Sequence, residues 1–420
     1  MLTPGGEWSR GPSVPARTNT TRPASAGRDS SQYSASPSEH RSESETFSRA
    51  TSDAESGDGQ RPYRAVVATL RTYPVPVPAP GSAQNAIYSE PVPFPAYLLT
   101  KTGEVIRPSV VELTEADLSA GEVVIEVEWS AINFKDAMVT RPGNRVARSF
   151  PLVPGVELAG RIRETGNSGF DEGQRVLVQG YDLGVAHHGG FAGCARVPAD
   201  WVVPLPDSLS CRQAAVIGLA GFTALLSLRR LRQHGLTPGD GPVLVTGASG
   251  GVGSTAVALL AAEGFEVVAS SGKTAEQDYL KGLGATDVVG RQFAEDDGRT
   301  LGPQLWAAVV DCVGGTALAQ ALRTVHYGGA VAASGLTGGN DLATTVYPFI
   351  IRGVALLGID TVATPIEERR RLWVEMGETF PLDRCDEMVN EEIGLDGLTA
   401  ALGRVLDAAV RGRILVAPAR

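Results

Sequence analysis

The residue pattern with the clearest chemical meaning is a run of glycines between an apolar segment and an alanine-rich segment. Residues 243–246 predict a strand and residues 252–263 a helix. Gly247, Gly250 and Gly253 allow the backbone to turn, to approach a pyrophosphate and to pack helix against strand. The helix N-terminus offers free N–H groups to phosphates. Because the glycines follow a strand and open a helix, they indicate a dinucleotide site, with an ordinary βα turn as the alternative.

The end of the second strand indicates which dinucleotide binds. An NAD site usually carries Asp or Glu about 20 residues after the glycines, where the carboxylate accepts from the ribose 2′-OH. This chain has Ser270, Ser271 and Lys273 there and no carboxylate. Hydroxyl and ammonium groups suit a 2′-phosphate, so NADPH is the predicted cofactor. The alternative is a solvated lysine beside a loosely bound adenosine.

A second polar group stands among apolar neighbours at residues 131–137. Asn133 could donate to an oxygen that gains negative charge, and Asp136 could orient a water molecule or Lys135. We expect these three residues to be catalytic. The open alternative is a turn that Asp136 caps at the start of a short helix.

Composition limits the classes of function. The chain has 420 residues, 43% of them hydrophobic, with a formal net charge of -10. This length allows two domains with a sizeable core, and the negative charge argues against nucleic acid as the main partner. The four cysteines are far apart, so neither a disulfide framework nor a cysteine-rich zinc site is indicated, and a cytoplasmic location is expected. The sequence has no uninterrupted apolar run of about 18 residues, so a membrane span is not predicted.

The N-terminal part of the chain predicts an extension followed by a β-rich domain. Residues 1–93 have few aliphatic side chains and many prolines, which predicts a disordered or linker extension. Pro12, Pro15 and Pro23 argue against a targeting helix, and a start codon placed too far upstream would give the same pattern. Short strands between glycines and prolines then predict a small β-barrel-like domain. These strands are expected at residues 96–100, 123–129, 156–163, 174–179, 191–197 and 201–204.

Residues 214–231 have helical character, and from residue 243 strands alternate with helices, which predicts a doubly wound parallel sheet. Two helices and a strand close the chain. Predicted strands are 265–269, 287–289, 307–311, 329–334, 354–359 and 413–417, and predicted helices are 274–283, 316–324, 366–379 and 398–409.

A metal site is not predicted. His187 and His188 are adjacent and cannot easily face one point, and Cys194 is their only nearby cysteine.

Several segments in combination resemble a known family. They are residues 133–137 (Asn-Phe-Lys-Asp-Ala), 150–160, 217–224, 348–354 and 357–360. Together they resemble the acrylyl-CoA reductase branch of the zinc-free, quinone oxidoreductase-like medium-chain dehydrogenase/reductases, over residues 94–420. The resemblance implies a GroES-like catalytic domain at 94–213, to which 360–420 returns, and an NADPH-binding Rossmann domain at 214–359. It also implies reduction of acryloyl-CoA to propanoyl-CoA in the cleft between the domains, by hydride transfer to the β-carbon.

The resemblance also assigns residues to roles. It places Asn133 and Asp136 in the active-site turn, and Val156 where zinc-containing relatives have a histidine ligand. Two departures are Phe134, where a tyrosine is typical, and Leu219, within a segment that usually reads Gly-Thr-Ala. The implied cofactor residues are Thr223; Ser249, Gly250, Gly251, Val252 and Gly253 for phosphates; Ser270, Ser271 and Lys273 for the 2′-phosphate; and Ser334, Gly335, Leu336, Phe349, Ile350 and Ile351 beside the nicotinamide.

Three functions stay open at this point. An enoyl-CoA reductase needs cations for the CoA phosphates, which Arg141, Arg145 and Arg148 could supply unless they form a solvated basic loop. A quinone or small enone reductase would not need them, and a non-catalytic NADPH-binding protein is the third possibility. Strand 354–359 is expected at a sheet edge, where pairing with a second copy would make a homodimer.

Overall fold

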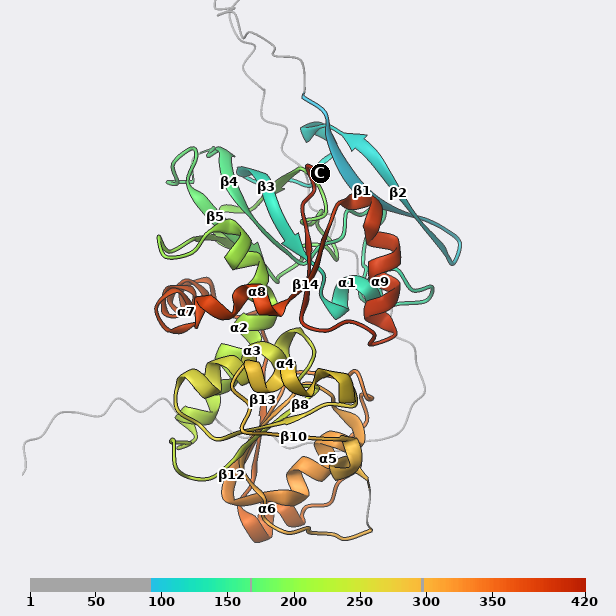
Figure 1. The fold of residues 1–420 in the computed structure, drawn as a ribbon. Coiled ribbons are helices and arrows are strands. Elements are labelled where there is room, and N and C mark those ends of the chain that lie inside the picture. The colour runs from blue at the N-terminus through green and yellow to red at the C-terminus, as the bar shows by residue number, and fades with distance from the viewer. Residues whose placement is uncertain (1–91, 167, 296–297) are drawn as a thin grey trace, which may run out of the picture. The chain divides into compact units, whose positions relative to one another are not determined.

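The computed structural model describes residues 92–166, 168–295 and 298–420, which belong to one compact unit. The predicted N-terminal extension therefore lies almost wholly outside the described residues. The described residues form two large sheets of different character and a two-stranded hairpin (Figure 1).

The first is a seven-stranded sheet that forms the barrel-like part. Its strands run in the order β14-β15-β3-β4-β5-β7, with β6 also paired to β3. Val123, Ile125 and Val127 of β3 point into its core, as the alternating apolar and acidic pattern predicted. β15 pairs antiparallel with β3, so the C-terminal segment, red in Figure 1, returns to the barrel. The strands are β3 (Val123–Ala131), β4 (Glu157–Glu164), β5 (Arg175–Gln179), β6 (Cys194–Val197), β7 (Val202–Pro204), β14 (Val389–Ile393) and β15 (Arg413–Val416).

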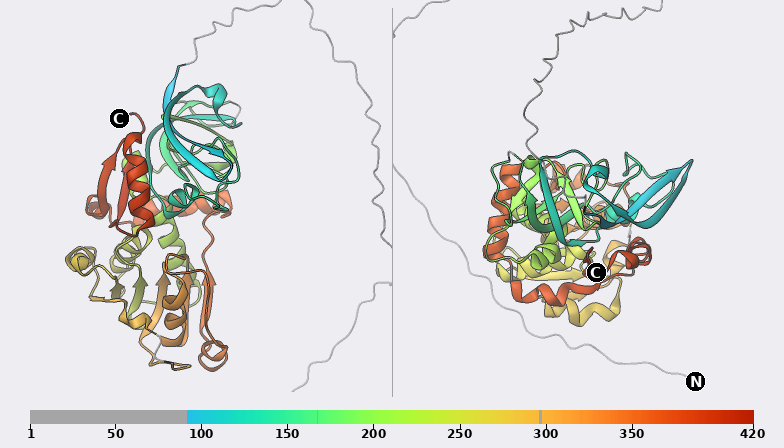
Figure 2. Two further views of the ribbon diagram at one scale, coloured as in Figure 1. Left: turned by 90° about the vertical axis from the view of Figure 1, so that its right-hand side faces the viewer. Right: turned by 90° about the horizontal axis from the view of Figure 1, so that it is seen from above.

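A two-stranded hairpin precedes this sheet. β1 (Phe94–Thr102) pairs with β2 (Val105–Leu113), and the hairpin projects from the barrel (Figure 2). Tyr97 and Leu99 of β1 are buried in the largest hydrophobic cluster of the described residues. β2 is largely exposed and lacks an apolar alternation, which explains why its sequence did not predict a strand.

The second sheet is parallel and six-stranded, in the order β10-β9-β8-β11-β12-β13. This is the strand order of a dinucleotide-binding Rossmann fold. β8 and β11 are buried throughout, so their sequences are continuously apolar, and β13 is the edge strand expected from the sequence. The strands are β8 (Val243–Thr246), β9 (Val267–Ser270), β10 (Asp287–Val289), β11 (Trp306–Asp311), β12 (Val325–Ala333) and β13 (Ala355–Gly358).

Helices cover both sheets (Figure 1). The α-helices of the Rossmann part are α3 (Gly251–Ala262), α4 (Gln277–Gly282), α5 (Gly315–Thr324) and α6 (Tyr347–Arg352), and those of the barrel part are α1 (Phe134–Val139), α7 (Ile366–Thr379), α8 (Cys385–Met388) and α9 (Leu398–Leu406). Short 3₁₀ turns span residues 115–117, 199–201, 274–276, 291–294, 382–384 and 395–397.

One long helix, α2 (Cys211–Gln233), connects the two parts. It begins at a capping box formed by Ser210 and Gln213 and is interrupted at Gly218, whose φ is 52°. By length and composition α2 is apolar enough to cross a membrane, but most of it is buried inside the protein, as in a core helix. The predicted domain boundary between residues 213 and 214 lies within its first turn.

Candidate active site

The glycine loop between β8 and α3 has the shape of a phosphate cradle. A Cβ atom on Gly253 would overlap the backbone of Gly247 and lie 2.6 Å from the Cα of Ala248, so only glycine fits. α3 begins at Gly251, and its N-cap residue Gly250 has no side chain to occupy the first N–H groups. The residues present therefore fit a pyrophosphate at this helix N-terminus.

The residues predicted for the 2′-phosphate lie beside this loop. The hydroxyl groups of Ser249 and Ser271 are 3.0 Å apart, and the backbone N–H of Lys273 donates to the Ser271 hydroxyl at 3.1 Å. Ser270 is buried at the end of β9, where its hydroxyl donates to the Gly290 carbonyl at 3.4 Å. The structure thus brings the predicted serines and Lys273 together at one corner.

Arg291 also belongs to this corner, and the sequence did not single it out. A Cβ atom on Gly272 would lie 2.5 Å from the Arg291 Cζ, so the guanidinium lies across the Gly272 backbone. Among the described residues, no hydrogen bond or ion pair engages this guanidinium group. The signal was its position, one residue beyond the Gly290 that follows β10, the strand next to β9.

Residues 407–412, which we call the C-terminal loop, border the same corner from the other side. The Lys273 Nζ donates to the Val410 carbonyl at 2.5 Å, and the Gly412 N–H donates to the Ser249 carbonyl at 2.9 Å. Arg411 lies over the Tyr279 ring and 3.5 Å from the Glu276 carboxylate. The adenosine end of the cradle is therefore built from both parts of the chain.

The two segments predicted beside the nicotinamide, residues 334–336 and 349–351, lie at different edges of the parallel sheet. The Ser334 N–H donates to the Asp311 carbonyl at 2.9 Å, and a Cβ atom on Gly335 would overlap the backbone of Cys312. Leu336 follows and is half exposed. Ser334, Gly335 and Leu336 therefore lie at the carboxyl ends of β11 and β12, on the same sheet edge as the glycine loop.

Phe349, Ile350 and Ile351 lie elsewhere. They belong to α6, which returns the chain to the start of β13 and so lies at the amino ends of the strands (Figure 1). Ile350 and Ile351 are 69% and 55% exposed. The structure does not bring these three residues to the cofactor edge, because a segment that precedes a parallel strand lies at the opposite edge from one that follows it.

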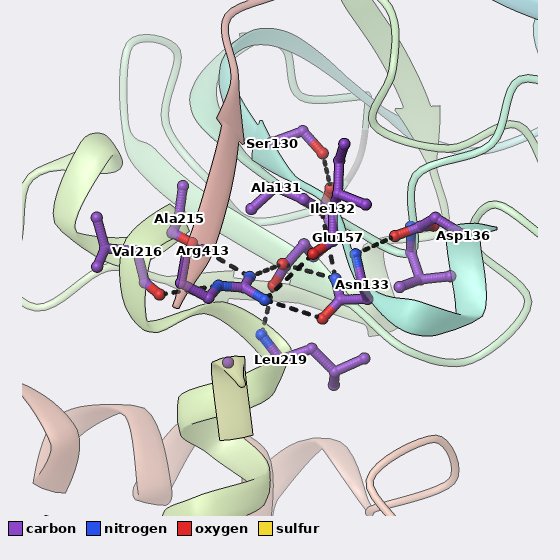
Figure 3. Close-up of polar contacts among 12 residues, drawn as sticks. Ser130, Ala131, Ile132, Asn133, Asp136, Glu157, Ala215, Val216, Leu219 and Arg413 are labelled. Atoms are coloured by element: carbon purple, nitrogen blue, oxygen red, sulfur yellow. Dashed lines mark hydrogen bonds and ion pairs between the residues drawn. The ribbon is translucent and has the colours of Figure 1, made fainter. Parts of the chain in front are cut away.

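The polar turn at the start of α1 is held by hydrogen bonds within the barrel (Figure 3). Asp136 is fully buried and accepts from the Asn133 N–H at 2.8 Å and from the Val156 N–H at 2.9 Å. The Asn133 amide donates to Glu157 at 2.8 Å and to the Ala131 carbonyl at 3.3 Å. Both side chains are therefore engaged, and Asn133 and Asp136 form a capping box at the start of α1, as in the alternative of a capped turn. Neither is the free donor or the water-orienting group that the other interpretation expected.

The protonation of Asp136 gives a testable pH dependence. Burial raises the pKa of Asp136 from its ordinary 3.8 to about 7, against the lowering effect of the two backbone N–H donors. The folded chain thus binds this proton more tightly than the unfolded chain. Its stabilising contribution is full below about pH 4 and is lost as the pH rises through about 7. We expect the free energy of unfolding to fall less between pH 5 and pH 8 in Asp136→Asn than in the wild type, in urea titrations.

The exposed Asp171 provides a matched control, because Asp171→Asn should keep the wild-type slope. Equal slopes for all three proteins would contradict a raised pKa at Asp136.

Lys135 differs from Asn133 and Asp136 in the contacts of its polar group. Its side chain is half-buried, and within the described residues no hydrogen bond or ion pair engages the ammonium. Burial lowers the pKa of Lys135, which also feels the charges of Asp136, Arg148, Asp182 and Asp360. Asp360 follows the carboxyl end of β13. Lys135 is therefore within electrostatic range of the residue that follows β13 at the carboxyl-end edge of the sheet.

The three arginines after this turn differ from one another. Arg148 forms an ion pair with Asp182. Arg141 and Arg145 are exposed and have no ion-pair partner in the part of the chain that the structure describes. Two of the three are thus available to an anionic ligand.

Thr223 and Val156 complete the predicted positions. Thr223 is buried in α2, and its hydroxyl donates to the Leu219 carbonyl at 2.7 Å. Val156 is buried at the position of the missing histidine ligand, and the ring of His188 contacts the Ser119 hydroxyl at 3.1 Å. Residues 92–166, 168–295 and 298–420 contain no group of three or more His, Cys, Asp or Glu side chains that could hold a metal.

Family models match both parts of the chain. Residues 119–207 match the alcohol dehydrogenase GroES-like domain, and residues 251–379 match the zinc-binding dehydrogenase family. The barrel is therefore a GroES-like domain.

Individual proteins match most of the described chain. The acrylyl-CoA reductase AcuI of Ruegeria pomeroyi is 45% identical over 311 residues, which are 74% of this chain and 94% of that protein. The crystal structure of Escherichia coli YhdH with bound NADPH has a TM-score of 0.74 at 43% identity, and it covers 77% of this chain and 99% of its own. Bacillus subtilis YhfP, named a quinone oxidoreductase and crystallised with NAD, has a TM-score of 0.76 at 42% identity over 78% of this chain and 100% of its own. The chain belongs to the acrylyl-CoA reductase branch of the quinone oxidoreductase-like medium-chain dehydrogenase/reductases and is an oxidoreductase.

Proposed function

We propose that the chain catalyses the NADPH-dependent reduction of a short enoyl-CoA, with acryloyl-CoA converted to propanoyl-CoA as its reaction. The observation that carries this proposal is the uncommitted, half-buried ammonium of Lys135 beside the cofactor edge. An enoyl thioester gains negative charge on its carbonyl oxygen during reduction, and a positioned cation stabilises that charge. The name of the Ruegeria relative supports the same substrate class.

NADPH, when bound, supplies the hydride that the β-carbon receives. The glycine loop binds its pyrophosphate, and Ser271, Lys273 and Arg291 bind the 2′-phosphate. Lys135 neutralises the thioester oxygen while the α-carbon takes a proton. Because Phe134 has no hydroxyl group, that proton comes from water or from Lys135 itself.

One assay separates the candidate functions. NADPH absorbance is followed with acryloyl-CoA, crotonyl-CoA and a benzoquinone in turn. Faster turnover of the CoA esters supports the proposal. Turnover of the quinone alone would replace it with the second candidate, which the name of the Bacillus relative favours. NADPH binding without any turnover would instead indicate the non-catalytic protein.

Arg141 and Arg145 offer a test of the CoA portion. Charge-assisted hydrogen bonds to phosphate are among the stronger ones, so Arg145→Ala should raise the KM for acryloyl-CoA about tenfold. The KM for the corresponding pantetheine thioester, which lacks the nucleotide phosphates, should stay unchanged. Arg148→Ala is the matched control, since Asp182 already pairs that charge. Equal KM increases for both esters would contradict phosphate binding by Arg145.

We also propose a homodimer that pairs β13 with its counterpart in a second copy. β13 is the sheet edge, and apolar side chains beside it are exposed: Val346, Tyr347, Ile350, Ile351 and Leu356. Unpaired edges and apolar patches of this kind are normally covered. Ile350→Glu should shift the molar mass in light scattering from dimer to monomer, whereas Val105→Glu, an exposed change on the hairpin, should not. A monomeric wild type would contradict this proposal.

We propose a cytoplasmic location. The four cysteines are free thiols, and burial raises the pKa of Cys194 to about 11 and that of Cys385 to about 12, so they are poor nucleophiles.

A further inference from the structure

A buried ion pair lies beside Gly218, where α2 is interrupted. Glu157 begins β4 and Arg413 begins β15, and their side chains are 5% and 3% exposed. Figure 3 shows them between the barrel and the interrupted helix. Because Gly218 departs from helical geometry, backbone groups on both sides of it lack their usual helical partners.

The guanidinium and the carboxylate replace those missing partners, each at the helix end that its charge stabilises. The Arg413 Nε donates to the Val216 carbonyl at 3.1 Å, at the end of the first half of α2. The Leu219 N–H, at the start of the second half, donates to Glu157. A cation at a helix C-terminus and a carboxylate at a helix N-terminus are what the helix dipole favours. A Cβ atom on Gly218 would lie 2.6 Å from the Arg413 Nη2, so the pair requires glycine there.

The same ion pair contacts both the turn at Asn133 and the start of α3. Glu157 accepts from the Asn133 amide at 2.8 Å, and the Arg413 Nη1 donates to the Asn133 Oδ1 at 3.2 Å. On the other side, a Cβ atom on Gly251 would lie 3.2 Å from the Arg413 Cδ. The arginine side chain therefore extends from the catalytic turn to the first residue of α3 in the phosphate cradle.

We propose that Glu157 and Arg413 are positioning residues. They fix the turn at residues 133–136, which carries Lys135, relative to the glycine loop, and thereby the approach of hydride donor and acceptor. A buried ion pair contributes little net stability compared with apolar residues of similar volume, but it fixes the geometry of every group bonded to it. Here those groups are Asn133 and the two halves of α2, and the start of α3 packs against the arginine side chain. The proposal rests on hydride transfer from NADPH and not on the identity of the acceptor.

The test compares Glu157→Gln, Arg413→Met and the double variant. Each single change leaves one buried charged group without its partner, so both Tm and kcat should fall. The double variant should regain most of the Tm, whereas its kcat should stay about 100-fold below the wild-type value, since misplacement by about 1 Å has that effect. The Kd for NADPH from fluorescence titration should change by less than about threefold, and the isotope effect with NADPH deuterated at the transferred position should increase. The acceptor is whichever of acryloyl-CoA, crotonyl-CoA and benzoquinone the wild type reduces fastest.

A double variant that regains kcat together with Tm would overturn the proposal, because the pair would then be structural only. A loss of NADPH affinity as large as the loss of kcat would overturn it as well. Hydrogen–deuterium exchange tests positioning without any acceptor, and so separately from the proposed function. Amides of residues 131–139 should exchange at least about tenfold faster in the double variant, whereas those of residues 247–254 should keep their wild-type rates, as unchanged NADPH affinity requires. Unchanged exchange at residues 131–139 would contradict the proposal.

Discussion

Lys135→Met is expected to lower kcat for acryloyl-CoA by about 100- to 1000-fold, the effect of removing one group that stabilises developing negative charge. Methionine keeps the length and the apolar contacts of the side chain but loses the ammonium. The Kd for NADPH should stay within about twofold, because the phosphate and adenosine contacts lie elsewhere. Stopped-flow measurement of NADPH oxidation, with a separate fluorescence titration, distinguishes the two parameters.

Two further measurements make this prediction specific. Lys281→Met, an exposed change on α4, should leave both parameters unchanged. Since burial lowers the pKa of Lys135, wild-type kcat should decline with rising pH earlier than an ordinary lysine would allow, and Lys135→Arg should remove that decline. A kcat for Lys135→Met near the wild-type value would exclude the ammonium from the reaction.

The double variant Lys273→Ala/Arg291→Ala is expected to lose at least about 100-fold in affinity for NADPH while its affinity for NADH changes by less than about threefold. If both cations bind the 2′-phosphate as proposed, each provides a charge-assisted hydrogen bond to a phosphate that NADH lacks. The two residues follow β9 and β10, and the pKa of Lys273 is lowered by burial and, to a smaller extent, by the Arg291 charge. Two close cations of this kind favour a shared anion between them.

The single variants measure how much Lys273 and Arg291 each contribute to NADPH affinity. Lys273→Ala and Arg291→Ala should each lose about 10-fold or more in NADPH affinity, and Gly272→Ala should act like Arg291→Ala because its methyl group would displace the guanidinium. Arg230→Ala, an exposed change on α2, is the control. Equal losses for NADPH and NADH would assign these residues to the shared part of the cofactor.

Much of the fold could be predicted because its central elements have strong local patterns. The apolar strand at 243–246 and the helix at 366–379 have the predicted bounds. The parallel sheet follows from the alternation of strands and helices between residues 243 and 358. β2 and β14 lack an apolar alternation, so their pairing depends on neighbours distant in sequence. α6 has six residues, too few for a helical periodicity to stand out.

The candidate site could be predicted only where its residues are local. The glycine loop and Ser271 with Lys273 follow from one βαβ unit. Asn133 was recognised as polar among apolar neighbours, but its partners Glu157 and Arg413 lie 24 and 280 residues away. No pattern in the sequence indicates that this amide is already engaged. The displacement of residues 349–351 to the other sheet edge follows from strand direction, which a motif alone does not convey.

The ion pair within the α2 break also constrains how the chain folds during synthesis. Arg413 follows Glu157 by 256 residues, so at about 5–20 residues per second the ribosome delivers the cation roughly 13–50 s after the carboxylate. During that interval the barrel lacks β15, and the Glu157 carboxylate lacks its guanidinium partner. The whole Rossmann sheet is synthesised within the same interval. The dinucleotide-binding half can therefore fold first and present a surface on which the barrel completes itself.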